Sequence, residues 1–355
     1  MGFSPLAYSK NFYKGWMKML NNRYVPADMA LWAGRVDSTD NYDAFRWHQW
    51  VREINLNSAD TLTFKGKLGF VLIGFCCDEG IRRNQGRIGA ANGPNAIRHE
   101  LANLPCTFTP DVLLFDGGNI ICTDGNMEES QATLASAVTI IRKLGFFPLV
   151  LGGGHELALG HYHGQQAFMV DNDQTSDIGI VNFDAHFDLR PFTNGSSSGT
   201  MFRQIAEEAV NSGQEFRYLC IGIQRYSNTL ELFKTADHYG VVYIPAEEVT
   251  VKGDWNVIEK LDEFMKSTKH IYLTVCADVF STAFAPGVSA AQPLGLHPED
   301  VLKYLKHILR SEKVIGFDIA EVSPRFDQDR TTASLAKVLI FSVVNTMCRL
   351  KGLAR

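Results

Sequence analysis

The 355-residue sequence lacks several features that would show at once which class of protein it belongs to. No run of lysine and arginine is long enough to follow a phosphate backbone, and 34 basic against 39 acidic residues leave a net charge of −5. This balance argues against a nucleic-acid partner. The seven cysteines form an odd, scattered set that does not resemble a disulfide framework, so we expect reduced thiols.

Targeting and membrane signals are also missing from the sequence pattern. The N-terminal residues lack the charged-then-apolar layout of a secretion signal, and no stretch approaches the roughly 20 apolar residues of a membrane helix. No internal repeat or low-complexity segment is visible. We therefore expect a soluble, cytoplasmic protein with neither a membrane nor a nucleic acid as its partner.

Short apolar runs alternate with helix-like segments along most of the chain. Near-continuous apolar strands indicate a mostly parallel sheet covered by helices on both faces. With 45% hydrophobic residues, the chain is long enough for one large α/β core. The sequence thus predicts a single three-layer α-β-α domain over residues 61–355 with about eight strands. The predicted strands are 68–75, 111–115, 147–151, 178–183, 218–223, 241–244, 271–279 and 314–319.

Residues 1–60 differ from the rest of the chain. They are aromatic and polar and show no clear period. We expect an N-terminal extension that packs on the domain, at a subunit contact.

One strand-like segment, residues 179–188, ends in three side chains that bind metals. Asp184, His186 and Asp188 are spaced two apart, so along an extended strand they point to the same face. Two carboxylates and an imidazole brought together beside a buried strand carry a desolvation cost unless a cation lies between them. Oxygen and imidazole ligands suit manganese, although ligand type alone also admits zinc, cobalt or iron.

Other predicted strand ends carry side chains of the same kind. His155 follows three glycines that permit a sharp turn, and no Lys-Ser/Thr pair follows to make this a phosphate loop. Cys276 and Asp278 share one face of another strand end, and Glu321 follows the last strand. Taken singly, each would be a helix cap or a salt-bridged acid. Because the carboxyl ends of parallel strands meet at one edge, one common site explains all four ends more simply.

Three of these motifs resemble the metal motifs of the arginase, or ureohydrolase, superfamily: Gly-Gly-Gly-His-Glu at 152–156, Asn-Phe-Asp-Ala-His-Phe-Asp at 182–188 and the region of Asp278. Further segments resemble the formimidoylglutamase branch of that superfamily in particular. The resemblance covers about residues 68 to 346, and its set of motifs is highly specific. The additional segments are 74–89, 182–190, 197–200, 227–229, 285–290 and 318–327.

The resemblance implies an arginase-like fold with a centre of two manganese ions. His155, Asp184 and Asp188 would surround one ion, with His186 and Asp278 at the other. Asp184 would bridge the two ions. The resemblance also implies a homo-oligomer that hydrolyses N-formimidoyl-L-glutamate to L-glutamate and formamide, a step of histidine degradation.

The mechanism implied by the resemblance is attack of a metal-bridging hydroxide on an amidine carbon. Asp188 would hold and relay the proton of the hydroxide, and Glu321 would hydrogen-bond the cationic formimino nitrogen. The two carboxylates of this substrate need hydrogen-bond donors. The candidates nearest to the motifs are Arg190, Ser197, Ser198, Thr200 and Arg225.

Other activities of the superfamily are the alternatives. In arginases the serine-glycine loop is followed, three residues after its glycine, by a catalytic histidine, where this chain has Phe202. Agmatinases share the Gly-Thr-x-Phe-Arg pattern of 199–203 but carry histidine at the position of Ser198. The first difference favours the formimidoylglutamase branch over an arginase, and the second favours it over an agmatinase. A guanidino-acid hydrolase stays an alternative.

Cys276 departs from the family pattern. The third motif normally has two aspartates two residues apart, and the first of them bridges both metals. A thiol has a reference pKa of about 8.5, so a protonated Cys276 would deprive the second ion of a ligand and of a compensating charge. The outcomes are a thiolate ligand that favours softer metals, a single tightly held ion, or a non-catalytic, metal-deficient protein. We expect a metal-binding enzyme with weakened affinity at the second site.

Overall fold

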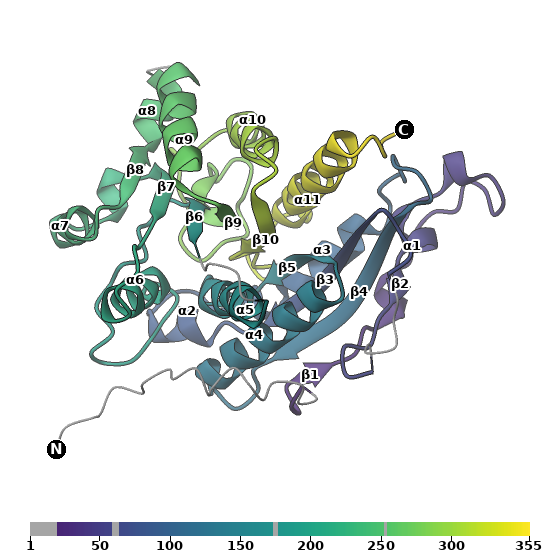
Figure 1. The fold of residues 1–355 in the computed structure, drawn as a ribbon, viewed down its shortest axis with the longest axis horizontal. Coiled ribbons are helices and arrows are strands. Elements are labelled where there is room, and N and C mark those ends of the chain that lie inside the picture. The colour runs from purple at the N-terminus through teal and green to yellow at the C-terminus, as the bar shows by residue number, and fades with distance from the viewer. Residues whose placement is uncertain (1–19, 59–63, 173–176, 252–253) are drawn as a thin grey trace.

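The computed structural model describes residues 20–58, 64–172, 177–251 and 254–355. A central sheet has helices on both faces (Figure 1). Among the described residues this sheet has ten strands in the order β1-β4-β3-β5-β10-β9-β6-β7-β8, with β2 paired to β4. The strands are β1 Tyr24–Val25, β2 Arg52–Glu53, β3 Leu68–Cys76, β4 Val112–Ile121, β5 Phe147–Gly152, β6 Ile178–Phe183, β7 Tyr218–Ile223, β8 Val242–Pro245, β9 His270–Cys276 and β10 Val314–Ala320.

The helices form two layers. The apolar core on one face of the sheet contains residues of α3 and α8 to α11, and the cores on the other face contain residues of α4 to α7. The helices are α1 Trp47–Trp50, α2 Glu79–Arg83, α3 Gly93–Leu101, α4 Met127–Lys143, α5 Leu157–Asp171, α6 Met201–Asn211, α7 Leu230–His238, α8 Ala246–Val251, α9 Asp254–Ser267, α10 Pro298–Leu309 and α11 Thr331–Leu350.

The predicted three-layer architecture with a mostly parallel sheet is confirmed. Each of the eight predicted apolar runs overlaps one of β3 to β10, and these strands pair in parallel. The prediction for 271–279 was too long, because β9 ends at Cys276 and the chain then turns through Ala277–Val279. The two-residue strands β1 and β2 were not predicted, since they lie in the segment that has no sequence period.

Strand β3 shows why the predicted strands are apolar throughout. Phe70 and Leu72 pack into the core on the side of α3, α10 and α11, whereas Val71 and Ile73 pack into the core under α4. Successive side chains of a strand point to opposite faces of the sheet. An uninterrupted apolar run therefore fits a strand that is covered on both faces.

The described part of the N-terminal segment lies along β4. Strand β1 pairs antiparallel with β4, and Trp32 Nε1 donates to the buried Asp116 Oδ2 at 2.7 Å. The Arg98 guanidinium donates to the same carboxylate at 2.7 Å. These contacts cover a sheet edge that would otherwise leave backbone groups open to pairing. The predicted boundary at residues 60/61 lies outside the described residues, as do residues 1–19.

Helix α11 is more apolar than the sequence-based expectation allowed. Its 20 residues include a window with a mean hydropathy of 1.4, so by length and composition it could cross a membrane. The expectation that no stretch approaches this length was therefore wrong for α11. In the structure the helix packs against α3 and α10, with Leu339, Ile340 and Val343 fully buried. Packing inside the domain accounts for its composition.

Candidate metal centre

The middle of the sheet brings four strand ends together. Strands β5, β10, β9 and β6 are neighbours in that order, and their register sets Ala320 beside Cys276. The chain after these strands carries the predicted ligands. His155 follows β5, Glu321 follows β10, Cys276 ends β9, and Asp184 follows β6. This edge is where parallel sheets place their sites.

The first group of candidate ligands surrounds His155. Its Nδ1 lies 2.9 Å from Asp184 Oδ2 and 3.1 Å from Asp188 Oδ2. The ligand atoms of His155, Asp184 and Cys276 all lie within 4.8 Å of one another, and the three residues are buried. An imidazole, carboxylates and a thiol therefore converge on one point.

The second group shares Asp184 with the first. His186 Nδ1 lies 3.2 Å from Asp278 Oδ2 and 3.5 Å from Asp184 Oδ1. The ligand atoms of Asp184, His186 and Asp278 also lie within 4.8 Å of one another. The two oxygens of Asp184 thus face different groups, as a bridging carboxylate would. We call the two groups together the ligand cage: His155, Asp184, His186, Asp188, Cys276 and Asp278.

The donor set of the ligand cage fits a divalent cation. Asp278 Oδ1 is buried and has no hydrogen-bond partner among the described residues, and His155 Nδ1 lies against the Asp184 and Asp188 carboxylates. Burial alone would lower the pKa of His155, yet Asp184 and Asp188 outweigh burial and raise that pKa well above its usual value. The carboxylates therefore favour positive charge at this point. A metal ion supplies such charge to nitrogen and oxygen ligands.

Cys276 is a neutral member of the ligand cage. Burial raises the pKa of its thiol well above the usual value, and the negative charges of Asp184, Asp278 and Glu321 act in the same direction. Burial and the nearby carboxylates therefore favour the protonated thiol.

Asp188 and Glu321 both have left-handed backbone conformations, with φ of 51° and 64°. Such conformations are uncommon outside glycine and cost about 1–3 kcal/mol each. The turn at Glu321 is held by its backbone N–H, which donates to Gly153 O at 2.8 Å. Glu321 Oε1 accepts from His155 N at 3.1 Å, while Oε2 is buried without a partner among the described residues. One oxygen of this carboxylate thus remains for a ligand.

The glycine turn before His155 brings backbone and side chains unusually close. A Cβ on Gly153 would collide with the Cys77 carbonyl oxygen, and one on Gly154 would collide with the Glu156 carboxylate. Glu156 is fully buried and accepts from Gly80 N at 2.9 Å. Burial raises the pKa of Glu156 to about 7. No role was predicted for this glutamate, although it directly follows His155.

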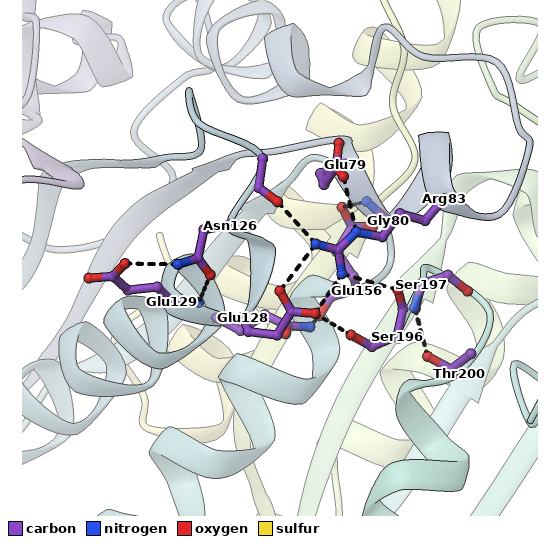
Figure 2. Close-up of polar contacts among 12 residues, drawn as sticks. Glu79, Gly80, Arg83, Asn126, Glu128, Glu129, Glu156, Ser196, Ser197 and Thr200 are labelled. Atoms are coloured by element: carbon purple, nitrogen blue, oxygen red, sulfur yellow. Dashed lines mark hydrogen bonds and ion pairs between the residues drawn. The ribbon is translucent and has the colours of Figure 1, made fainter. Parts of the chain in front are cut away.

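Residues 196–200, the substrate loop, form a tight turn before α6. Three predicted substrate-binding residues lie in it and are buried: Ser197, Ser198 and Thr200. Ser197 N donates to Thr200 Oγ1 at 2.9 Å, and this hydroxyl donates to Ser197 O at 3.0 Å (Figure 2). The Thr200 hydroxyl is therefore engaged in hydrogen bonds within the turn. Arg190 lies against the loop, because its N–H donates to Gly199 O at 2.9 Å.

Arg83 of α2 anchors the substrate loop, as Figure 2 shows. Its Nη1 donates to Glu128 Oε1 at 2.5 Å and to Ser196 O at 3.3 Å. Ser196 Oγ donates to Glu128 Oε1 at 2.5 Å, and Arg83 Nε donates to Glu79 Oε1 at 3.0 Å. The guanidinium thus joins α2, the start of α4 and the loop. No sequence spacing indicated this contact, since Arg83 and Ser196 are 113 positions apart.

The two predicted substrate-binding arginines lie in different surroundings. Arg190 is half-buried, and its Nη1 lies 3.6 Å from Asp188 Oδ1. Arg225 is mostly exposed and pairs with Glu247 of α8, with 3.0 Å between Nε and Oε1. Among the described residues, the structure joins Arg190 to the ligand cage but does not join Arg225 to it.

Two buried side chains that the sequence did not single out support the ligands. Thr274 Oγ1 lies 3.0 Å from His155 Nε2, and Asn182 Nδ2 donates to Asp184 Oδ2 at 3.2 Å. Both lie two residues before a predicted ligand, on the same strand face. That spacing was the available signal for Thr274, which precedes Cys276.

Comparison with known proteins gives the same picture. The arginase family matches residues 68–345. A formimidoylglutamase of Clostridium tetani is 56% identical over 336 residues, which cover 94% of this chain and 99% of the relative. A formimidoylglutamase of Geobacillus thermodenitrificans is 42% identical over 313 residues, which cover 88% of this chain and 94% of the relative.

Solved structures share the fold. The formimidoylglutamase of Bacillus subtilis superposes with a TM-score of 0.73 at 23% identity, over 88% of this chain and 94% of that one. The Trypanosoma cruzi formiminoglutamase with Mn2+2 superposes with a TM-score of 0.70 at 26% identity, over 83% of this chain and 98% of that one. The predicted arginase-like fold is thereby confirmed.

Proposed function

This chain belongs to the arginase family, and we propose that it hydrolyses N-formimidoyl-L-glutamate to L-glutamate and formamide. The observation that carries this proposal is the pair of ligand groups that share Asp184. The relative that is 56% identical over 94% of this chain is a formimidoylglutamase, and it supports the choice of substrate. The reaction breaks a C–N bond of a linear amidine.

Manganese is the metal that we assign to the ligand cage. A formiminoglutamase structure with Mn2+ supports this choice, as do the oxygen and imidazole ligands. When bound, two such ions act as Lewis acids and lower the pKa of water, so that a nucleophile forms at neutral pH. One ion would be held by His155, Asp184 and Asp188, and the other by Asp184, His186 and Asp278, with Cys276 beside the first.

Asp188 and Glu321 are the residues that we assign to the reaction. Asp188 accepts the proton that the attacking water loses and returns it to the glutamate nitrogen as the C–N bond breaks. Arg190 Nη1 lies 3.6 Å from Asp188 Oδ1 and places a positive charge beside this carboxylate. Glu321 Oε2, the buried oxygen without a protein partner, accepts a charge-assisted hydrogen bond from the formimino nitrogen.

Arg190 is the strongest candidate to bind a substrate carboxylate. It lies between Asp188 and the substrate loop, and a guanidinium offers two parallel donors to a carboxylate. Ser197 and Ser198 of the same loop add further donors. Arg225 has less support, because its guanidinium already pairs with Glu247.

Phe202 argues against the arginase alternative. Its ring is fully buried, stacks on Tyr218 at 4.5 Å between centroids and meets the His155 ring edge-on at 5.6 Å. A phenyl ring packed in this way cannot carry a proton.

The homo-oligomer and the cytoplasmic location stay predictions.

A substrate panel tests the proposed function. The purified chain, loaded with Mn2+, is assayed for formamide release from N-formimidoyl-L-glutamate and for urea release from arginine, agmatine and a guanidino acid. We expect turnover of the formimidoyl substrate alone. Turnover of a guanidino substrate instead would refute the assignment, and turnover of none would favour the non-catalytic alternative.

A further inference from the structure

The proposed substrate has two carboxylates, and the predicted arginines account for only one of them. Arg190 lies beside the ligand cage, whereas the Arg225 guanidinium pairs with Glu247. Two other arginines, Arg87 and Arg325, have no ion-pair partner among the residues that the structure describes. Both side chains are exposed. They are therefore the cations to consider for the second carboxylate.

The fold brings both arginines to the edge of the sheet that carries the ligand cage. Arg87 follows β3 and α2, and Arg325 follows β10, so both segments leave the sheet at the carboxyl ends of parallel strands. Arg325 is four positions after Glu321, so their Cα atoms are at most about 14 Å apart. The Phe326 N–H donates to Ser323 O at 3.1 Å, a turn that shortens this separation.

The two segments pack directly against each other. A Cβ on Gly89 would lie 2.4 Å from Ser323 Oγ and 2.9 Å from Arg325 Cβ. Both guanidinium groups lie over the ring of Phe326, with Cζ of Arg87 at 4.3 Å and Cζ of Arg325 at 5.5 Å from its centroid. Two positive charges are thus gathered around one aromatic ring.

Arg87 is held in place although it is exposed. Its backbone N–H donates to Ser289 Oγ at 2.8 Å, its Nε donates to Ser289 O at 3.0 Å, and its Nη2 donates to Val288 O at 2.7 Å. These acceptors are neutral, so they leave the charge of the guanidinium unbalanced. A side chain that is already fixed loses little conformational entropy when it binds an anion.

Two acidic side chains of these segments are engaged elsewhere. Asp78 Oδ2 accepts from Gly89 N at 2.7 Å. The two carboxylate oxygens of Asp327 accept from backbone N–H groups at the start of α11, at 2.9 Å and 3.1 Å. Their hydrogen bonds to the backbone explain why these acids do not pair with Arg87 or Arg325.

We propose that Arg87 and Arg325 form an anion site that binds the side-chain carboxylate of the substrate. The inference rests on the proposed function, because it takes N-formimidoyl-L-glutamate as the ligand. Arg190 lies beside Asp188, which protonates the glutamate nitrogen in the proposed reaction, so it is placed for the α-carboxylate next to that nitrogen. The distal carboxylate is left for the arginine pair, whose N–H donors suit it.

A pair of substrates tests the anion site. N-formimidoyl-L-glutamine has nearly the shape of N-formimidoyl-L-glutamate, but its side chain ends in a neutral amide. The full chain loaded with Mn2+ is expected to prefer the glutamate substrate about 10–100-fold in kcat/KM, and Arg87→Gln and Arg325→Gln are each expected to lose most of that preference. A purely structural role of Arg87 would slow both substrates alike and leave the preference unchanged.

Arg330→Gln is the matched control. Arg330 is an exposed arginine of the same segment, and its guanidinium lies 3.5 Å from Glu100 Oε1. Its substitution should leave the preference for the glutamate substrate as it is in the unaltered chain. An equal loss of preference in Arg330→Gln would overturn the anion site, because it would mean that any positive charge of this segment has the same effect.

Binding of L-glutamate and L-glutamine, measured by calorimetry on the same proteins, separates the two proposals. If the unaltered chain releases formamide but keeps its preference in Arg87→Gln and Arg325→Gln, the anion site alone fails. If it hydrolyses neither substrate, yet binds L-glutamate more tightly than L-glutamine and loses this difference in both variants, the proposed function alone fails. If it shows neither turnover nor a preference in binding, both fail.

Discussion

The ligand cage and the substrate loop adjoin each other, yet they are held in place by different means. The cage side chains extend from the ends of neighbouring buried strands, so the register of the sheet sets their positions. The substrate loop depends on the contacts of Arg83 with Glu128 and Ser196, and the Glu128 side chain is 53% exposed. The comparison teaches that the register of the sheet positions the ligand cage, while a few side-chain contacts position the loop beside it.

The largest effect within the loop region is expected from Arg190. Arg190→Ala should raise KM for N-formimidoyl-L-glutamate roughly 10–100-fold, because a charge-assisted contact to a substrate carboxylate is lost. Arg225→Ala should change KM less than about twofold, as expected when an exposed ion pair is removed. Steady-state kinetics of both variants measure this. Equal effects of the two substitutions would break the distinction between the arginines.

Within the ligand cage, the revealing substitution is Cys276→Asp. The carboxylate adds a charge where the thiol is protonated, so manganese content should rise toward two ions per chain and hydrolysis should increase roughly tenfold, the scale on which groups around a metal tune it. Cys276→Ser is the control, because it adds no charge. Metal analysis and formamide release follow both variants. An unchanged stoichiometry and rate in Cys276→Asp would show that this position does not limit the cage.

The smallest effect is expected from the anchor of the substrate loop. Arg83→Gln should raise KM roughly two- to tenfold with little change in kcat, because about 0.5–1.5 kcal/mol of loop-ordering contact is lost. Arg82→Gln is a close control, since Arg82 is more exposed and pairs with Glu79. A drop in kcat with unchanged KM would mean that Arg83 acts on the ligand cage and not on the loop.

Much of the fold could be predicted because the sheet is buried on both faces. Each apolar run from β3 to β10 is long enough to mark a strand, and the ligands follow at strand ends with a spacing of two, as at Asp184 and His186. The strands β1 and β2 could not be predicted, because they are two residues long and exist through pairing with β4. The apolar composition of α11 has its reason in packing against α3 and α10, which no local pattern reveals.

The parts of the site that escaped prediction are contacts between distant positions. Thr274 reaches His155 across 119 positions and Arg83 reaches Ser196 across 113, so neither contact leaves a local motif. The pairing of Arg225 with Glu247 could not be predicted either, because proximity to a motif in the sequence does not show where a side chain points. The protonation of Cys276 depends on burial and on the surrounding carboxylates, and both arise only in the folded chain.

The most direct test of the central claim, that the ligand cage is the metal centre of a formimidoylglutamate hydrolase, measures two quantities in one titration. Mn2+ is added to the metal-depleted chain, and bound manganese and formamide release are followed together. The account predicts that formamide release is absent without metal and rises in step with bound manganese. Stoichiometric manganese binding without any formamide release from N-formimidoyl-L-glutamate would contradict it.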